Sequence, residues 1–274
     1  MSEPSGLDAY FESIGYAGDA SPTLATLRDI QRLHPERIPF ENLDPLLGVR
    51  VSLDIAAIHN KLVTRHRGGY CYEHNLLLKH MLQTMGFRVS GLAARVRWGV
   101  PEGVTLPLTH MLLRVEIDGR TWIVDVGFGG QVLTAPMLLE PGLVQPTPHE
   151  NYRLMEDGDG YLLEWQLVDE WQTLYRFDLR EQLLPDYELS NWYVSTHPAS
   201  RFTANLAVAR TEPGRRYTLR NDSFAIHGTH GETDRRALTS VAEMKDLLRD
   251  CFRIPLPGHP DLDARLSRFL TAAN

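Results

Sequence analysis

Residues 67–75 read Arg-Gly-Gly-Tyr-Cys-Tyr-Glu-His-Asn, so a cysteine, Cys71, follows shortly after two glycines. The glycines interrupt the backbone pattern. From Cys71 to Met85 apolar side chains then recur at helical spacing before Gly86, a residue typical of helix ends. We therefore expect a helix that begins at Cys71. A thiol at a helix N-terminus faces the positive end of the helix dipole, which favours the reactive thiolate.

The residues before this stretch also have helical patterns. Residues 7–14 are amphipathic, and Ser-Pro at 21–22 supplies an N-cap and a first-turn proline for a helix to about residue 34. Pro35 is expected to end that helix. Ser52 can cap a further helix that runs to about Arg65. Residues 1–88 are thus predicted to form a helical bundle that carries Cys71.

From Phe87 onward, β-branched and alternating residues are typical of strands. The predicted strands cover residues 89–98, 108–117, 120–126, 152–154, 162–168 and 174–179. They predict an antiparallel sheet or barrel within residues 89–195. Residues 196–274 are predicted to form a small α/β lid, with strands at 206–209 and 217–219 and a helix at about 240–252, capped by Thr239 or Ser240. The fold class is therefore α+β, and without repeats or long linkers the three parts should pack tightly.

Composition narrows the class of protein. The chain has 274 residues, of which 43% are hydrophobic and 23% charged, as in ordinary globular proteins. A net charge of -7 argues against nucleic acid as a partner unless one face is locally basic. The start of the chain lacks the order of a signal peptide and no apolar run reaches membrane-spanning length, so we expect a cytoplasmic protein without a membrane partner. Cys71 and Cys251 are expected to be free, Cys251 as a core thiol.

An Asp-Gly pair at 118–119, between alternating runs, predicts a two-residue hairpin turn. This turn pairs Ile117 with Arg120 and so fixes the register along both strands. One face of the hairpin is then apolar. The other carries His110 and Asp125 as diagonal neighbours, about 7–8 Å apart at the backbone, whereas a slip by one residue would place them on opposite faces.

These residue types suggest a catalytic group. A cysteine nucleophile needs a base to take its proton, and the base needs an orienting partner on its other ring nitrogen. Taken singly, Cys71 could be an inert buried thiol, His110 an ordinary strand histidine and Asp125 a turn cap. Together they predict a Cys-His-Asp core like that of cysteine peptidases.

Other readings of the nearby residues are weaker. His66, His74 and His80 crowd around Cys71, but their spacing scatters them around a helix and no second cysteine is near, so we expect no metal site. The Gly-Phe-Gly-Gly loop at 127–130 lacks the glycine spacing and the lysine of nucleotide-binding loops. Because it directly follows the aspartate, we expect it to form a wall of the site.

Five segments of the chain, taken together, closely resemble the arylamine N-acetyltransferases. They are Ile38–Leu43 (Ile-Pro-Phe-Glu-Asn-Leu), residues 67–75, Thr109-His110, residues 125–129 (Asp-Val-Gly-Phe-Gly) and residues 192–198 (Trp-Tyr-Val-Ser-Thr-His-Pro). The match spans nearly the whole chain in the order of the family and is least evident from about Asp250. Members of this family have a helical bundle, a β-barrel and an α/β lid, in agreement with the three predicted parts.

The resemblance implies a ping-pong transfer of an acetyl group from acetyl-CoA, through an acetyl-cysteine, to an aromatic amine, a hydrazine or an N-hydroxyarylamine. It implies catalytic roles for Cys71, His110 and Asp125. The residues it implies for acceptor binding are Phe40, Phe128 and Phe202, and those for coenzyme A binding are Thr109, Gly127 and Gly129. Without the resemblance, core packing would be the preferred role of the three phenylalanines. Arg67 and Glu73 are expected to build the turn before the helix, and the role of Asn75 stays open.

Three alternatives remain at this point. An amide synthase of polyketide or ansamycin assembly resembles the same family and would use the same triad intramolecularly. A papain-like cysteine hydrolase has the same chain order of cysteine, histidine and acid, but this sequence lacks a glutamine upstream in the usual oxyanion position. A non-enzymatic binding module would tolerate Cys71→Ser. The sequence leaves open the physiological acceptor, the groups that bind the adenine and pyrophosphate, the oxyanion donors and the oligomeric state.

Overall fold

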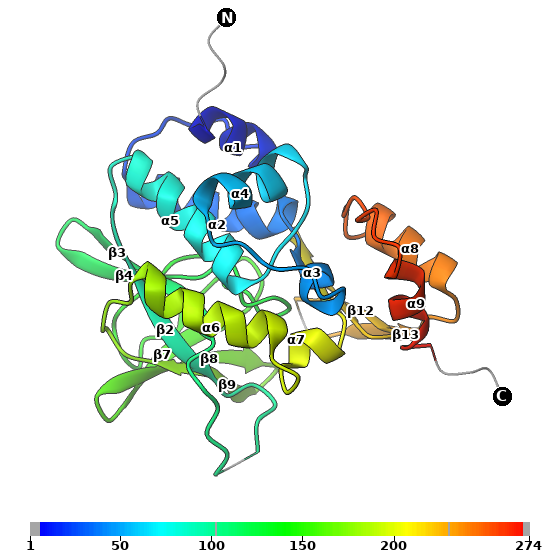
Figure 1. Cartoon of the computed structure of the whole chain (residues 1–274). Helices are drawn as coiled ribbons and strands as arrows, with labels where there is room; N and C mark the ends of the chain where they lie inside the picture. Colours follow the sequence, from blue (N-terminus) through cyan, green and yellow to red (C-terminus); the bar gives the residue numbers. More distant parts are fainter. Residues whose placement is uncertain (1–5, 102, 230, 271–274) are drawn as a thin grey trace, which may run out of the picture.

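The N-terminal part of the computed structural model is helical (Figure 1), and the structure describes residues 6–101, 103–229 and 231–270. Its elements are α1 (Gly6–Ile14), α2 (Leu24–Arg37), α3 (Leu43–Leu46), α4 (Ile55–His59), the π-helix η1 (Asn60–Thr64) and α5 (Cys71–Thr84). The helix predicted to begin at Cys71 is confirmed. Gly86, the second residue beyond its end, has a φ of 90°, which a glycine adopts without strain.

Both predicted ends of the second helix are wrong. Pro35 lies inside α2, which continues to Arg37. A proline near the end of a helix removes a single backbone hydrogen bond, and burial of this face of α2 outweighs that loss. The N-cap of α2 is Thr23, whose side chain accepts from the N–H of Thr26 at 3.2 Å.

The helix predicted from Ser52 to Arg65 begins later and changes its winding. Asp54 caps α4, because its Oδ1 accepts from the N–H of Ala57 at 2.9 Å. Ser52 instead accepts from the N–H of Asp54 at 3.2 Å. At Asn60 the chain passes into η1, and single π-helical turns of this kind are common at functional sites.

The middle part is an eight-stranded antiparallel sheet in the order β5-β4-β3-β2-β9-β8-β7-β6. The strands are β2 (Arg88–Val96), β3 (His110–Ile117), β4 (Arg120–Val124), β5 (Met137–Leu138), β6 (Gln145–Pro146), β7 (Asn151–Asp157), β8 (Gly160–Leu167) and β9 (Glu170–Phe177). All six predicted strands overlap a strand of this sheet. The side chain of Gln145 bonds to both the N–H and the carbonyl of Leu138, at 2.8 and 2.9 Å. This contact joins the edge strands β5 and β6, so the sheet is a nearly closed barrel.

The predicted hairpin register is confirmed. Ile117 lies opposite Arg120, and Leu113 opposite Val124. Leu113 packs into the core shared with the helices, as do its neighbours on the same face of β3 and β4. Leu112, on the other face, packs into the core inside the barrel. The hairpin therefore separates two cores, and His110 and Asp125 lie on the barrel side.

The last part contains a second antiparallel sheet, in the order β1-β10-β11-β12-β13. Its strands are β1 (Phe40–Glu41), β10 (Ala207–Glu212), β11 (Arg215–Arg220), β12 (Ser223–Gly228) and β13 (Thr233–Ala237), and they are accompanied by α8 (Val241–Asp250) and α9 (Leu262–Ser267). The N-cap of α8 is Ser240. Since β1 pairs with β10, a short segment of the predicted bundle belongs to the lid sheet. The boundaries at residues 88 and 195 stay a prediction.

Several elements of this half were missed from sequence. Helices α6 (Leu184–Thr196) and α7 (Arg201–Ala204) connect the barrel to the lid, and α6 crosses in front of the barrel strands in Figure 1. Leu184, Leu189 and Trp192 of α6 are exposed, while buried positions include the polar Asn191 and Ser195. The apolar residues thus form no helical stripe. Strand β13 is exposed along its whole length and has no alternating pattern.

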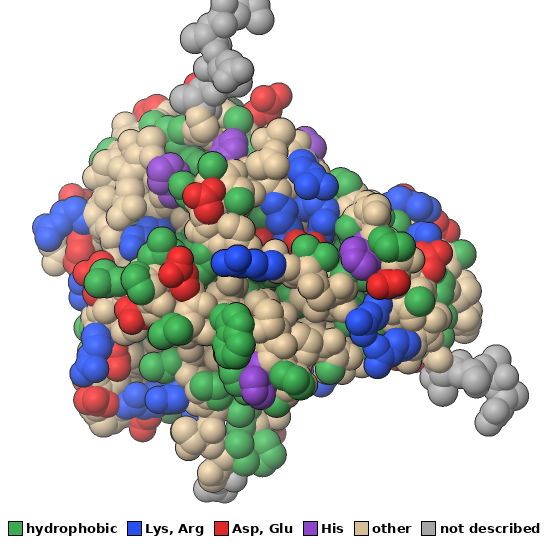
Figure 2. Space-filling model, in the orientation of Figure 1, with side chains coloured by type: hydrophobic (Ala, Val, Ile, Leu, Met, Phe, Trp, Pro, Cys, Tyr) green, Lys and Arg blue, Asp and Glu red, His purple; other side chains and the backbone are tan. Residues whose placement is uncertain are grey.

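The distribution of surface charges and the state of the two cysteines are those of an ordinary globular protein. Acidic and basic side chains are interspersed on the face shown in Figure 2, so the described residues there give no uniformly basic surface. Both cysteines are free, and Cys251 is half-buried at the edge of the lid core. Within the described parts of the chain, no helix has the length and apolar character needed to cross a membrane.

Candidate active site

Cys71 is the first residue of α5, and its side chain is buried with 4% of its surface exposed. The two preceding glycines allow a close approach of the chain. A Cβ at Gly68 would lie 2.2 Å from the carbonyl oxygen of Pro39, and one at Gly69 would lie 2.7 Å from a carboxylate oxygen of Glu73. The helix start is closed by Glu73, whose Oε2 accepts from the N–H of Tyr70 at 3.1 Å.

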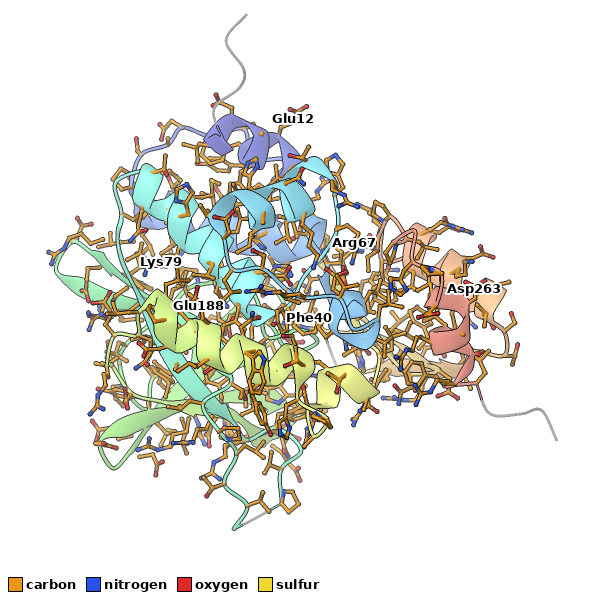
Figure 3. The ribbon with its side chains drawn as sticks, in the orientation of Figure 1. Glu12, Phe40, Arg67, Lys79, Glu188 and Asp263 are labelled. Atoms are coloured by element: carbon orange, nitrogen blue, oxygen red, sulfur yellow. The ribbon has the colours of Figure 1, made fainter. Side chains whose placement is uncertain are left out.

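A cluster of buried charges holds this turn. Lys61, on η1, pairs with Glu73 at 2.7 Å and with Asp44 at 2.6 Å. Arg67, labelled in Figure 3, pairs with Glu41 at 2.6 Å and with Asp44 at 3.0 Å. Burial raises the pKa of Glu73 although Lys61 opposes the shift. Arg67 and Glu73 thus make ion pairs that tie the turn to neighbouring elements, as expected from sequence.

His110 and Asp125 are in direct contact. Nε2 of His110, the first residue of β3, lies 2.7 Å from Oδ2 of Asp125, directly after β4. Burial alone would lower the pKa of His110. The Asp125 carboxylate, together with Cys71, instead raises it to about 10, so the ring is protonated at neutral pH. Since Nε2 is bound to the carboxylate, Nδ1 is the nitrogen left for Cys71. The predicted same-face pairing is confirmed.

Asp125 accepts further hydrogen bonds that hold its orientation. Nδ2 of Asn75 and the N–H of Gly127 donate to Oδ1 at 3.0 and 2.8 Å, and the Tyr175 hydroxyl donates to Oδ2 at 3.1 Å. Burial opposes the charge, but His110, Asn75 and the N–H of Gly127 keep the pKa of Asp125 below its ordinary value. Asn75 also donates to the carbonyl of Met111 at 2.8 Å, so it links α5 to β3. No motif around Tyr175, on β9, marks it in the sequence.

Gly127 brings the loop after β4 against the start of α5. A Cβ at this position would lie 2.7 Å from Cα of Cys71 and 2.8 Å from Nδ2 of Asn75. Contacts this short between Cβ and backbone atoms essentially never occur in proteins. Because Gly127 has no side chain, the loop after β4 can pack against Cys71, and Asp125 and Cys71 can both lie next to His110.

These residues lie at a cavity of about 990 Å³ between the barrel and the lid. Its lining includes every predicted site residue except Asp125, which is fully buried behind His110: Cys71, His110, Thr109, Gly127, Gly129, Phe40, Phe128 and Phe202. The ring of Phe128 meets that of His110 edge-on, with centroids 5.1 Å apart. The ring of Phe40, labelled in Figure 3, lies 5.9 Å from that of Phe202.

The lid side of the same cavity adds residues that the sequence did not suggest. Arg201, Arg220 and Arg235 contribute to its lining and are exposed to solvent. Exposed guanidinium groups at the mouth of a cavity are suited to bind phosphate groups. Among the described residues, no group of three or more His, Cys, Asp or Glu side chains is arranged to hold a metal ion.

Known proteins resemble this chain over most of its length. A family model described as N-acetyltransferase matches residues 23–260. The arylamine N-acetyltransferase of Mycobacterium tuberculosis is 45% identical over 252 residues, which are 90% of this chain and 89% of the relative. The arylamine N-acetyltransferase / N-hydroxyarylamine O-acetyltransferase of Salmonella typhimurium is 38% identical over 269 residues, 97% of this chain and 95% of the relative.

A solved structure also matches the fold. The Mycobacterium marinum arylamine N-acetyltransferase in complex with CoA has a TM-score of 0.93 at 42% identity, covering 97% of this chain and all of that chain. The helical bundle, the barrel and the lid therefore have the same arrangement in both proteins. From its sequence, its fold and these relatives together, the chain belongs to the arylamine N-acetyltransferase family.

Proposed function

We propose that this chain transfers the acetyl group of acetyl-CoA to arylamines, hydrazines or N-hydroxyarylamines through an acetyl-cysteine at Cys71. The observation that carries the proposal is the contact of His110 with Asp125 beside Cys71 at the cavity. A protonated imidazole next to a thiol stabilises the thiolate, which is the nucleophilic form.

In the first half-reaction the Cys71 thiolate attacks the thioester carbonyl of acetyl-CoA. As the tetrahedral intermediate collapses, the bond to the CoA sulfur breaks and protonated His110 gives its proton to the leaving thiolate. Backbone N–H groups in the first turn of α5 are candidate donors to the oxyanion. The products are acetyl-cysteine, coenzyme A and a neutral His110.

In the second half-reaction the nitrogen of the acceptor attacks the acetyl-cysteine. Neutral His110 accepts the proton that the nitrogen loses, and the bond to the Cys71 sulfur breaks. This regenerates the thiolate beside a protonated ring. Asp125 keeps Nδ1 of the imidazole directed at Cys71 in both steps and stabilises the charged form of the ring.

The walls of the cavity suit both substrates. An arylamine is neutral near pH 7, so its ring needs apolar contacts, which Phe40, Phe128 and Phe202 can supply. Thr109, Gly127 and Gly129 are proposed to contact the donor near the nucleophile. The phosphate groups of coenzyme A are then proposed to lie toward Arg201, Arg220 and Arg235 at the lid.

No observation favours the alternative reactions. The relatives from M. tuberculosis and S. typhimurium are named acetyltransferases, not amide synthases or peptidases. The relative from M. marinum was solved in complex with CoA, which supports acetyl-CoA as the acetyl donor for this chain. A cytoplasmic location stays a prediction from the sequence.

Intact-protein mass spectrometry tests the proposal. Mixing the protein with acetyl-CoA, without an acceptor, should add about 42 Da, the mass of one acetyl group, and addition of aniline should remove it. Cys71→Ala should gain no mass, whereas Cys251→Ala, the matched control at the other free thiol, should behave like the wild type. A wild-type protein that never gains this mass, or a Cys71→Ala variant that does, would overturn the proposal.

A further inference from the structure

Three fully buried side chains form a hydrogen-bonded row that runs from α1 through α2 to α5, the helix that carries Cys71. The Tyr10 hydroxyl lies 2.8 Å from Nδ1 of His34, and Nε2 of His34 lies 2.8 Å from Nδ1 of His74. Nε2 of His74 lies 3.1 Å from the carbonyl oxygen of Gly69 and 3.2 Å from that of Pro39. The proposed reaction uses none of the three side chains.

The partners of the row fix the position of every proton in it. Carbonyl oxygens only accept, so Nε2 of His74 carries a proton and donates to both of them. In a neutral ring Nδ1 of His74 then accepts, so Nε2 of His34 donates. Nδ1 of His34 accepts in turn from the Tyr10 hydroxyl. Burial lowers the pKa of His74 to about 4, and burial together with the neighbouring His74 holds the pKa of His34 well below its ordinary value, so both rings are neutral at pH 7.

The end of the row joins the turn before Cys71 to the segment that carries Phe40. Gly69 lies in the turn before Cys71, and Pro39 precedes Phe40. The two backbones also meet directly, since the N–H of Glu41 donates to Gly69 at 2.7 Å. The ring of Phe40 is nearly parallel to that of His74, at 8° with centroids 6.4 Å apart. One imidazole thus contacts both the turn before the nucleophile and the cavity wall.

We propose that Tyr10, His34 and His74 are positioning residues that hold Phe40 at a fixed place relative to Cys71 and so determine how well the acceptor binds. The proposal rests on the proposed function, in which Phe40 contacts the arylamine. Cys71 has further anchors at the start of α5, namely the Glu73 cap and the close packing of Gly127. A change in the row should therefore move Phe40 more than the nucleophile.

Two variants of His34 test the row. His34→Leu removes the donor to His74, which frees that ring to change its tautomer and release the two carbonyls. We expect the KM for aniline to rise by about tenfold, while the rate of acetyl-cysteine formation from acetyl-CoA changes by less than about twofold. In His34→Gln the side-chain amide can still donate toward His74, so this variant should restore most of the affinity for aniline.

Tyr10→Phe tests the row from its far end and leaves the packing of the ring in place. It should raise the same KM by about threefold, and Tyr187→Phe, a control that loses a buried 3.1 Å bond to the carbonyl of Leu92, should not. The proposal is wrong if the KM for aniline stays unchanged in His34→Leu and Tyr10→Phe, or if both half-reactions fall together, as loss of folded protein would cause. Absence of acetyl-cysteine in the wild type would instead refute the proposed function itself.

Discussion

Replacement of Asp125 by asparagine separates the charge of this side chain from its shape. The amide has nearly the same size, and its oxygen can still accept from Asn75 and Gly127. Its NH₂ group then faces Nε2 of His110, where a carboxylate oxygen now lies at 2.7 Å. Two N–H groups cannot face each other, so the ring must carry its proton on Nδ1. This tautomer presents an N–H to Cys71 and cannot take a proton from it.

The size of the effect follows from the pKa of His110. Burial opposes the charge, but the carboxylate and Cys71 raise the pKa to about 10, so protonated rings outnumber neutral rings by about 10³ at pH 7. Without the carboxylate, burial becomes the dominant influence and lowers the pKa below the ordinary 6.5. The preference for the charged ring therefore falls by at least about 10³, or roughly 4 to 5 kcal/mol. We expect the rate of acetyl-cysteine formation at pH 7 to fall by about the same factor.

Rapid quenching followed by intact-protein mass spectrometry measures this rate directly, and the rate of Cys71 alkylation by iodoacetamide gives a second reading of thiolate content. Asp157→Asn is a suitable control, because Asp157 is a half-exposed carboxylate on the barrel that pairs with Arg176. If Asp125→Asn is acetylated at pH 7 within about tenfold of the wild-type rate, the charge of the carboxylate does not activate the nucleophile and the reasoning fails.

The remaining predictions concern stability and local geometry. Between pH 6.5 and about 10 the free energy of unfolding should fall, because folded His110 keeps a proton that the unfolded chain releases near pH 6.5. The free energy of unfolding should also fall from pH 6.5 toward about 4, because His74 stays neutral in the folded protein while the same side chain binds a proton in the unfolded chain. Urea titrations at a series of pH values measure this free energy. If they show no maximum near pH 6.5, both pKa shifts are contradicted. Gly127→Ala should lower the melting temperature and slow acetylation by at least about tenfold, whereas Gly258→Ala, where a Cβ has open space, should match the wild type in a thermal scan and in turnover. Tyr175→Phe removes one hydrogen bond from the carboxylate that holds His110 and should slow acetylation by about tenfold in the quench assay; an unchanged rate would show that the other donors suffice.

Local rules were sufficient to place Cys71 at the start of a helix and to put His110 and Asp125 on one face of a hairpin. A helix that starts after two glycines positions Cys71, and a two-residue turn fixes the hairpin register that puts His110 and Asp125 on one face. Such rules act over a few residues, so they can be applied without knowing the rest of the fold. Tyr175 could not be found in this way. It lies on β9, two strands from β3 in the sheet, and reaches Asp125 because the sheet curls into a barrel.

The elements that were not predicted were missed for one physical reason. Their sequence patterns depend on contacts with distant parts of the fold. Helix α6 exposes leucines and a tryptophan while it buries polar side chains, so its apolar residues give no helical period. Pro35 is tolerated because the end of α2 is buried. Strand β13 pairs with β12 through its backbone, although its side chains are exposed. Periodicity reports burial, and these segments are not buried on one regular face.

His110 acts in the proposed chemistry, whereas His74, which is nearer to Cys71 in sequence, does not. The difference lies in the hydrogen-bond partners of the two buried rings. His110 and His74 are both buried, and burial by itself disfavours the charged ring in each. Their partners decide the outcome: a carboxylate beside His110 keeps it protonated, whereas carbonyl oxygens and a neutral imidazole leave His74 uncharged. Both nitrogens of His74 are also occupied, although it lies only one helical turn from Cys71. A ring without a free nitrogen cannot shuttle a proton, so His74 can only hold the backbone in place, whereas His110 can donate to the leaving thiolate and accept from the incoming amine.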